Sequence, residues 1–269
     1  SEGSKFKIVT LSYDEYPDLP VVKKENGITI KQNVLKDMIK KTIFAVSTDE
    51  VRPILTGVLF DVAGKELTMV ALDGFRMAVK NNIIMNDNDF KAVIPGKTLS
   101  EIGKIINESE DNVNIYFSKN HIQVQIEDTI IVSRLLEGEF INYKQIIPAE
   151  YKIKIKVSSN LLMEACDRAA LFARDSSNNM IKFEINDDMM VIMSNSQNGD
   201  VHEELKVQKE GNDIEIAFNA KYFIDVLKVI ESEEITIEFT TNVSPSIIRP
   251  VKDEDYLYLV LPARFKKNN

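Results

Sequence analysis

Residues 93–106 read VIPGKTLSEIGKII, and residues 217–230 read AFNAKYFIDVLKVI. The two stretches align without a gap, so that Lys97 aligns with Lys221 and Glu101 with Asp225. A repeat of this length is typical of a duplicated domain rather than of a short solenoid unit. Two similar domains in tandem predict a function that depends on an assembled surface rather than on one catalytic cleft.

The composition is that of an ordinary globular protein. The chain has 269 residues, of which 44% are hydrophobic, and a mean hydropathy of -0.15, which suits two domains of roughly 120 residues each. No apolar run approaches the roughly 18 residues of a membrane span, and the first residues lack the apolar core of a signal peptide. The single cysteine, Cys166, is expected to be a buried thiol in a reducing compartment. We therefore expect a cytoplasmic protein without a membrane segment.

Hydrophobic periodicity predicts two helices in each half, at 31–46, 97–107, 158–174 and 219–230. The remaining sequence is rich in short β-branched runs separated by Gly, Asn, Asp and Lys. This pattern predicts antiparallel sheets with the helices on one face, and hence an α+β fold.

The repeat also predicts the domain boundaries. GVLFDVAGKELTMVAL at 57–72 matches MIKFEINDDMMVIMSN at 180–195 in its pattern of apolar and polar positions. We place the two domains at 26–147 and 148–269. A lead at 1–25 contains the strand-like FKIVTL and fits neither repeat.

Charge is distributed unevenly between the helices and the rest of the chain. The net charge is -9 at pH 7, which by itself argues against nucleic-acid binding. The four helical segments nevertheless carry ten Lys/Arg and five Asp/Glu, a formal +5, so the remainder carries -14. One interpretation is a basic helical layer on an acidic body. The other is ordinary solvated helix faces with i,i+4 pairs such as Lys97–Glu101.

The sequence contains little that could support catalysis or metal binding. The only two histidines, His121 and His202, lie near neither a cysteine nor a spaced pair of carboxylates, so we expect no metal and no cofactor. Phosphate loops, dinucleotide-binding loops and nucleophile elbows are absent from the sequence. The dipeptide Asp73-Gly74 within ALDGFRMAV is typical of a hairpin turn, but a turn does not explain the arginine at Arg76.

From this stretch outward, the sequence resembles the bacterial sliding clamp, the beta subunit of DNA polymerase III. ALDGFRMAV is similar to that family's T-D-G-H-R-L-A, VRPILTGVLF to its V-R-x-x-L-x-G-x-L-F, and FNAKYFIDVLKVI to its F-N-x-x-Y-L-L-D-V-L. The ending YLYLVLPAR resembles Y-x-x-M-P-M-R, and KFKIVTLSYDEYPDLP resembles the last strand and helix of the family's first domain. The resemblance implies the second and third of three clamp domains, preceded by the tail of the first.

This resemblance implies a role in DNA replication without catalytic activity. In the family, two three-domain subunits close head to tail into a homodimeric ring, with helices around a DNA channel and sheets outside. The implied partners are duplex DNA bound without sequence preference, the replicative polymerase, the clamp loader, and other polymerases and repair factors. The cations expected to face DNA are Lys36, Lys40, Lys41, Lys104, Arg168 and Lys221.

The resemblance also implies a groove between the second and third domains for a partner peptide of the form Gln-Leu-x-Leu-Phe. Apolar walls would anchor its Leu and Phe. We expect the stem of Arg76 to form one wall with its charged head in water, and Tyr222 and Arg264 to contact the other end of the peptide. The lining residues are Arg52, Leu55, Leu72, Gly74, Phe75, Arg76, Met77, Ile141, Gln145, Ile146, Asn219, Tyr222, Val243, Leu259, Val260, Leu261, Pro262, Ala263 and Arg264.

This lining departs from the family pattern at five positions. Phe75 stands for the usual His, Leu72 for a frequent Thr, Ile141 for Pro, Gln145 for a basic residue and Ala263 for Met. We therefore expect the groove to be more apolar near Phe75 and roomier near Ala263. The rival class is a two-domain metal-dependent phosphoryl-transfer enzyme with Asp73 as a metal ligand. A plain peptide-binding adaptor is a third alternative.

Overall fold

The structure, a computed structural model, describes residues 3–15, 20–22, 26–86, 88–173, 179–197 and 199–264.

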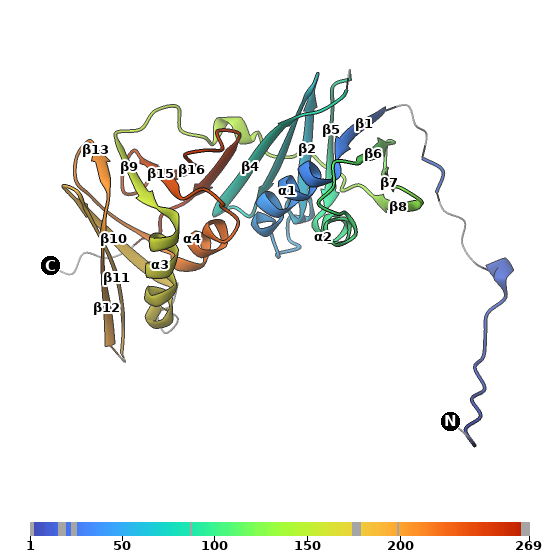
Figure 1. Ribbon diagram of the computed structural model, residues 1–269, viewed down its shortest axis with the longest axis horizontal. Helices are drawn as coiled ribbons and strands as arrows, with labels where there is room; N and C mark the ends of the chain where they lie inside the picture. Colours follow the sequence, from blue (N-terminus) through green and yellow to red (C-terminus); the bar gives the residue numbers. More distant parts are fainter. Residues whose placement is uncertain are drawn as a thin grey trace.

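Residues 3–15 of the lead lie away from the folded body (Figure 1). Residues 6–11 were expected to form a strand, but they carry no regular secondary structure, and Phe6, Ile8 and Val9 are 89%, 82% and 90% exposed. The strand prediction is therefore wrong in this structure. A strand needs a neighbouring backbone to complete its hydrogen bonds, and none of the described strands pairs with these residues.

The first repeat contains two helices and eight strands in the described residues. In chain order they are β1 (Asn26–Lys31), α1 (Gln32–Thr42), the 3-10 turns η2 (Ile43–Ala45) and η3 (Pro53–Thr56), β2 (Gly57–Ala63), β3 (Glu66–Leu72), β4 (Arg76–Ile83), β5 (Phe90–Pro95), α2 (Gly96–Ile105), β6 (Asn112–Phe117), β7 (His121–Ile126) and β8 (Thr129–Arg134).

The second repeat follows a connecting segment that contains the 3-10 turn η4 (Tyr143–Gln145). Its elements are β9 (Ile153–Ser158), α3 (Ser159–Ala173), β10 (Met180–Asn186), β11 (Met189–Ser196), β12 (Gly199–Lys206), β13 (Gln208–Glu210), β14 (Ile214–Asn219), α4 (Ala220–Leu227), β15 (Glu234–Phe239), β16 (Ser246–Pro250) and β17 (Tyr256–Val260).

The duplication is visible in the sheet topology. The order β4-β3-β2-β5 in the first repeat corresponds to β12-β11-β10-β14 in the second, and β1-β6-β7-β8 corresponds to β9-β15-β16-β17. Every described strand pairing is antiparallel. Because β17 pairs with β4, one sheet of the first repeat and one sheet of the second form a single nine-stranded sheet.

Alternating and helical burial patterns explain why these elements form. β9 reads IKIKVS and buries its Ile and Val residues while its lysines stay partly exposed, which is the pattern of a strand with one buried face. In α1, Leu35, Met38 and Ile39 lie on the buried face, and α3 buries Leu162 and Cys166. Figure 1 shows α1 beside α2 and α3 beside α4.

Strand β2 differs from β9, because all its residues except the last are buried. A strand reads as a continuous apolar run when both of its faces are covered. One face of β2 packs against the helices of the first repeat, and the other lies beneath the connecting segment. The outer side of the nine-stranded sheet is therefore also apolar at this point.

The predicted fold class is confirmed: tandem α+β domains built of antiparallel sheets with two helices each. The helix predicted at 31–46 is shorter in the structure, because α1 ends at Thr42. The hydroxyl of Thr42 donates to the Met38 carbonyl at 2.7 Å. Within the described ranges, the helices include none long and apolar enough to cross a membrane.

Candidate functional site

The two repeats meet where β4 pairs with β17. In this register Arg76 lies opposite Val260, Met77 opposite Leu259, and Lys80 opposite Tyr256. Successive side chains on a strand point to opposite faces of the sheet. Met77 and Leu259 therefore share the outer face, whereas Arg76 and Lys80 share the face that carries the helices.

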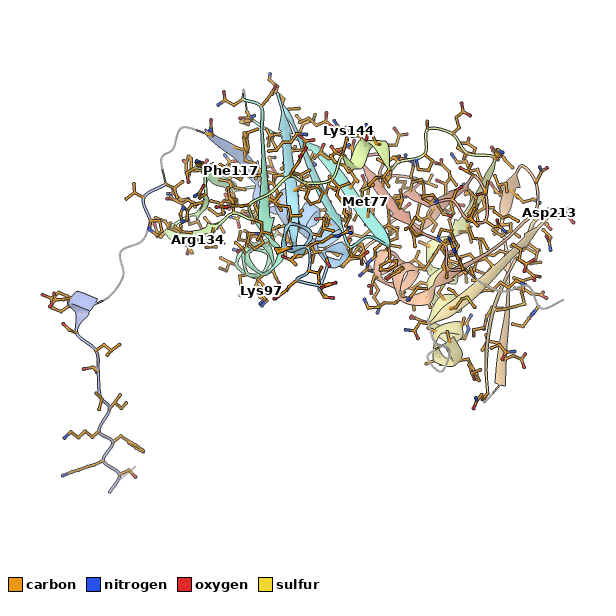
Figure 2. All side chains as sticks on the ribbon, turned by 180° about the vertical axis from the view of Figure 1, so that it is seen from behind. Met77, Lys97, Phe117, Arg134, Lys144 and Asp213 are labelled. Carbon is orange, nitrogen blue, oxygen red and sulfur yellow. The ribbon has the colours of Figure 1, made fainter. Side chains whose placement is uncertain are left out.

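The outer face of the junction is an apolar cluster, which we call the outer cluster. Its buried members come from both repeats, and the connecting segment covers them. They are Leu55, Leu59, Val70, Leu72, Met77, Val79, Val93, Tyr143, Ile247, Leu257 and Leu259, with Ile54, Leu136, Phe140, Ile146, Ile147 and Leu261 packed against them. Figure 2 shows Met77 of β4, and Lys144 of the connecting segment, at the middle of the molecule, where the repeats meet.

A buried hydrogen bond holds the connecting segment on this cluster. The Tyr143 hydroxyl donates to Oδ2 of Asp61 at 3.1 Å, and the Lys91 ammonium lies 3.3 Å from the same oxygen. Burial raises the pKa of the Tyr143 hydroxyl, and Asp61 raises it further. The phenol is therefore held as a neutral donor. It fixes the segment that carries Gln145 and Ile146 beside the cluster.

A cleft of about 670 Å³ opens beside the outer cluster. Leu55 of the cluster lines it, together with the turn that precedes β4 and with Tyr222 of α4. Phe75 is 60% exposed, and its ring stacks on Tyr222 with the centroids 6.3 Å apart and an angle of 21° between the planes. Phe75 and Tyr222 thus give this cleft an aromatic wall.

The turn before β4 explains the Asp-Gly dipeptide and the arginine that follows it. Gly74 has a φ of +93°, which favours glycine. Oδ1 of Asp73 accepts the backbone N–H groups of Phe75 and Arg76 at 2.9 and 3.0 Å. Asp73 therefore shapes a turn, as the Asp-Gly dipeptide predicted. Its other oxygen is engaged by the Arg76 guanidinium.

The Arg76 side chain is buried, contrary to expectation. Its Nε donates to Asp73 at 2.9 Å, Nη1 to Asp225 of α4 at 2.6 Å, and Nη2 to the Phe44 carbonyl at 2.8 Å. The guanidinium carbon also lies 4.8 Å from the centroid of the Tyr222 ring. The prediction of a solvated head is wrong, because the alternation of β4 turns this side chain toward the helices, where two carboxylates compensate its charge.

These contacts fix the charges of the pair. Burial alone would lower the pKa of the Arg76 guanidinium, but its partners raise it overall. Burial alone would raise the pKa of Asp225, but hydrogen bonds from Lys221 and Arg76 lower it below its ordinary value of 3.8. Both groups are therefore ionised at neutral pH.

A second ion-pair cluster links the repeats at Lys80, four residues after Arg76 along β4. Asp253 accepts from Lys80 at 2.6 Å and from Lys41 at 2.8 Å, and Lys41 also lies 2.9 Å from Asp37. The Lys41 side chain is only 11% exposed. Its predicted role as a DNA-facing cation is therefore corrected: the ammonium belongs to the junction between the repeats. Burial opposes the charge on Lys41, and the two carboxylates raise its pKa overall.

Most of the predicted groove residues lie in the outer cluster or at the cleft. Leu55, Leu72, Met77, Ile146, Leu259 and Leu261 belong to the outer cluster, and Arg52, Gly74, Phe75, Arg76 and Tyr222 line the cleft. Val260 is fully buried in the main core on the helix side, so its assignment to the groove is wrong. Ile141 lines a different cavity, of about 750 Å³, which the connecting segment shares with Leu59 and Val93 of the outer cluster.

The remaining predicted residues flank the site. Val243 is 74% exposed in the loop before β16, and Gln145 and Arg264 are exposed. Asn219 accepts the N–H of Lys221 as the cap of α4, and the Ala263 N–H donates to Ala217. Pro262 is half-buried.

The other predicted DNA-facing cations all lie on helices and all have acidic neighbours. Lys36 lies 3.5 Å from Glu108, Lys40 2.8 Å from Glu231 and Lys104 2.7 Å from Glu101. Arg168 binds Glu203 at 2.7 and 2.8 Å, and Lys221 binds Asp225.

Sequence reasoning missed the residues that hold the junction together. Ile247 and Leu257 lie in strands with apolar alternation, and this signal could have placed them on the outer face. Asp225 and Asp253 carry no such signal, because an acidic residue on a helix or in a turn is normally solvated. Metal chemistry finds no support in the described part of the chain, which contains no group of three potential ligands.

Comparison with known proteins matches both repeats to one family. The profile for the DNA polymerase III beta subunit, central domain, matches residues 29–142, and that for its C-terminal domain matches residues 144–264. The beta sliding clamps of Staphylococcus epidermidis and Staphylococcus aureus are each 37% identical over 267 residues, covering 98% of this chain and 71% of the relative.

Solved structures agree with this match. A putative DNA polymerase III beta subunit from Eubacterium rectale is 36% identical with a TM-score of 0.92, over 98% of this chain and 72% of that one. A DNA polymerase sliding clamp from Bacillus subtilis is 37% identical with a TM-score of 0.92, over 95% and 69% of the two chains.

Two repeats fused through one sheet, with helices on one side and an apolar junction on the other, define a tandem clamp-domain protein. The chain belongs to the DNA polymerase III beta subunit family, the bacterial sliding clamps. This membership makes it a processivity subunit of DNA replication without catalytic activity, as the resemblance implied. The phosphoryl-transfer alternative has no support.

Proposed function

We propose that this chain supplies two of the domains of a ring that encircles duplex DNA and tethers polymerases to it. The observation that carries this proposal is the continuous sheet across the junction of the repeats. It joins two domains edge to edge while their helices stay on the same side. Repetition of one such junction leads to a closed ring with a helical lining.

The sheet edges support the way in which further domains would be added. β12 is equivalent to β4, and β8 is equivalent to β17, yet each of them ends a sheet in the described residues. Ile130 of β8 is 52% exposed. An unpaired strand edge is a template for pairing with another chain. In the three-domain form we propose that these edges close a homodimeric ring head to tail.

For the chain as it stands, we propose a mainly monomeric state in dilute solution. Sedimentation equilibrium tests this directly. A stable dimer that remains on circular DNA would contradict it.

We further propose that the cleft and the adjoining outer cluster bind a peptide of the Gln-Leu-x-Leu-Phe type. Such a peptide would be carried by the replicative polymerase, the clamp loader, and other polymerases and repair factors. The exposed Phe75–Tyr222 stack and the partly exposed Leu261 offer apolar surface at the mouth of the site. Few buried anchors supply most of the affinity in such sites.

Calorimetry with this peptide tests the groove. We expect a Kd of about micromolar, roughly -8 kcal/mol. Leu261→Asp should weaken binding by about 2 kcal/mol or more, because it sets a charge against a buried anchor. Met77→Asp is a less specific test, because Met77 is 2% exposed and the change would also destabilise the fold. Val243→Asp, at an exposed flank, is the milder companion. Absence of binding by the unmodified chain would contradict the proposal.

DNA binding without encirclement should be weak. We expect a Kd no tighter than roughly 10⁻⁴–10⁻⁶ M, with steep salt dependence and no preference for base sequence. Titration of labelled duplexes of different sequence over a series of salt concentrations measures this, and a marked sequence preference would contradict it. We also propose a cytoplasmic location, supported by the single buried thiol of Cys166.

A further inference from the structure

The two pairs of helices differ in charge although they are equivalent in the fold. α1 and α2 carry five lysines and two carboxylates, a formal +3. α3 and α4 carry two cations and three carboxylates, a formal -1. The cations next to these helices in the sequence, Lys31 for the first pair and Arg174 and Lys228 for the second, shift the two totals to +4 and +1, so the difference persists.

The cations of the second repeat are also less available. Arg168 makes a bidentate pair with Glu203 at 2.7 and 2.8 Å, and bidentate pairs are the stronger kind. Lys221 binds Asp225, which is already the partner of the buried Arg76. A phosphate that recruited Lys221 would therefore disturb the compensation of Arg76.

The cavity between α3 and α4 sets carboxylates among its cations, Arg168, Lys221 and Lys228. It has a volume of about 560 Å³, and Asp167 and Asp225 line it beside the cations. On the exposed side of α3, Leu161 and Leu171 are 54% and 60% exposed. Neither carboxylates nor leucines can donate hydrogen bonds to phosphate oxygens.

The cations of the first repeat are held more loosely. Lys104 pairs with Glu101, but both side chains are about two-thirds exposed, at 67% and 65%. Glu108, 3.5 Å from Lys36, is 84% exposed. Exposed pairs of this kind contribute little and exchange readily. Lys97 is exposed at the start of α2 (Figure 2) and has no ion pair among the described residues.

We infer that duplex DNA is held chiefly by α1 and α2 of the first repeat, through Lys36, Lys97 and Lys104, and that α3 and α4 contribute little attraction. This inference rests on the proposed DNA-encircling function. It predicts that DNA passes closer to one repeat than to the other, although the folds of the two repeats match.

The duplication provides a matched experiment. Lys97 and Lys104 of the first repeat align with Lys221 and Lys228 of the second. The variants Lys97→Gln/Lys104→Gln and Lys221→Gln/Lys228→Gln therefore remove the same charge from equivalent positions. Binding of a short labelled duplex by the full chain would be followed by fluorescence anisotropy over a series of salt concentrations.

Each phosphate contact contributes about 0.9 to the slope of log K against log salt. The first variant should lose about 1.8 of that slope and about tenfold in affinity at low salt. The second should lose less than about 0.5 and less than about twofold. Thermal unfolding checks that both variants fold; peptide binding would not serve, because Lys221 also lines the cleft proposed for the peptide.

Equal losses in the two variants, or a larger loss in the second, would overturn this inference and leave the DNA-binding proposal standing. Failure of the unmodified chain to bind any duplex at low salt would overturn both.

Discussion

The two faces of the β4–β17 junction carry opposite chemistry on the same pair of strands. The outer face buries Met77 and Leu259 among other apolar side chains, whereas the helix face buries Arg76 and Lys80 against carboxylates of the other repeat. Apolar burial stabilises the junction in proportion to area and is not directional. Charge pairing instead requires one arrangement.

The outer face therefore stabilises the contact between the repeats, whereas the helix face fixes which residues of β4 and β17 pair. A slip of one residue between β4 and β17 would move the whole side-chain set to the other face. Arg76 and Lys80 would then face the outer cluster without compensation, which costs far more than a displaced methionine. The outer face can accordingly remain adaptable enough to serve as a binding surface, because the helix face already fixes the register.

The largest expected effect comes from Arg76→Met, which leaves Asp73 and Asp225 without their buried partner. We expect a loss of about 3–5 kcal/mol in the free energy of unfolding, measured by urea denaturation. Asp225→Asn in the same chain should recover part of the loss by removing one uncompensated carboxylate. Arg76→Lys should not substitute, because one ammonium cannot reach both carboxylates and the Phe44 carbonyl. A loss below about 1 kcal/mol for Arg76→Met would mean that the helix face is not decisive.

The outer face should respond to cavity formation. Leu259→Ala removes buried apolar volume, since Leu259 is 2% exposed, and should cost about 2–4 kcal/mol by the same measurement. Leu259→Met keeps the volume and should cost less than about 1.5 kcal/mol. Similar losses for the two variants would indicate that packing does not dominate this face.

The pH dependence of the unfolding free energy should reveal the contribution of the ion pairs on the helix face. Burial alone would raise the pKa of Asp253, but Lys41 and Lys80 lower it below 3.8. A carboxyl group with a lowered pKa stabilises the fold above its unfolded pKa, and this contribution is lost as the pH falls through the folded pKa. Asp253→Asn should therefore cost about 2 kcal/mol at neutral pH. The difference from the unmodified chain should shrink in acid below about pH 4, and a difference independent of pH would contradict this.

Tyr143→Phe tests the connecting segment over the outer face. The change removes only the hydroxyl that donates to Asp61, so we expect a loss of about 1 kcal/mol in unfolding free energy. Peptide affinity should fall as well, because Ile146 of the same segment packs against the outer cluster. Calorimetry at a temperature where the variant is folded measures that second effect. Unchanged affinity would show that the segment does not position the groove.

The smallest effect is expected at the rim. Lys40 and Glu231 bridge the repeats at 2.8 Å, but their side chains are 48% and 73% exposed. Lys40→Gln should change the unfolding free energy by less than about 0.5 kcal/mol, because solvent screens exposed pairs. A cost near that of Asp253→Asn would remove the distinction between buried and exposed bridges across this junction.

The sequence by itself determined the duplication, the four helices and the antiparallel sheets, because hydrophobic periodicity is a local property of the chain. It also identified the ALDGFRMAV turn as important. Resemblance to the clamp family then pointed to Leu72, Met77 and Leu259, which the structure gathers into one cluster.

Tertiary structure alone decided which face each of those strand residues occupies. Val260 was assigned to the groove, yet the register of β17 on β4 buries it on the helix side. Arg76 does line the cleft, but its charged head, which was expected in water, is buried against carboxylates. Lys41 has the pattern of a solvated helix residue, but the other repeat brings Asp253 to it from 212 positions away. Long-range pairing of charges leaves no periodic trace in sequence, because its energy depends on distance and burial in the folded state.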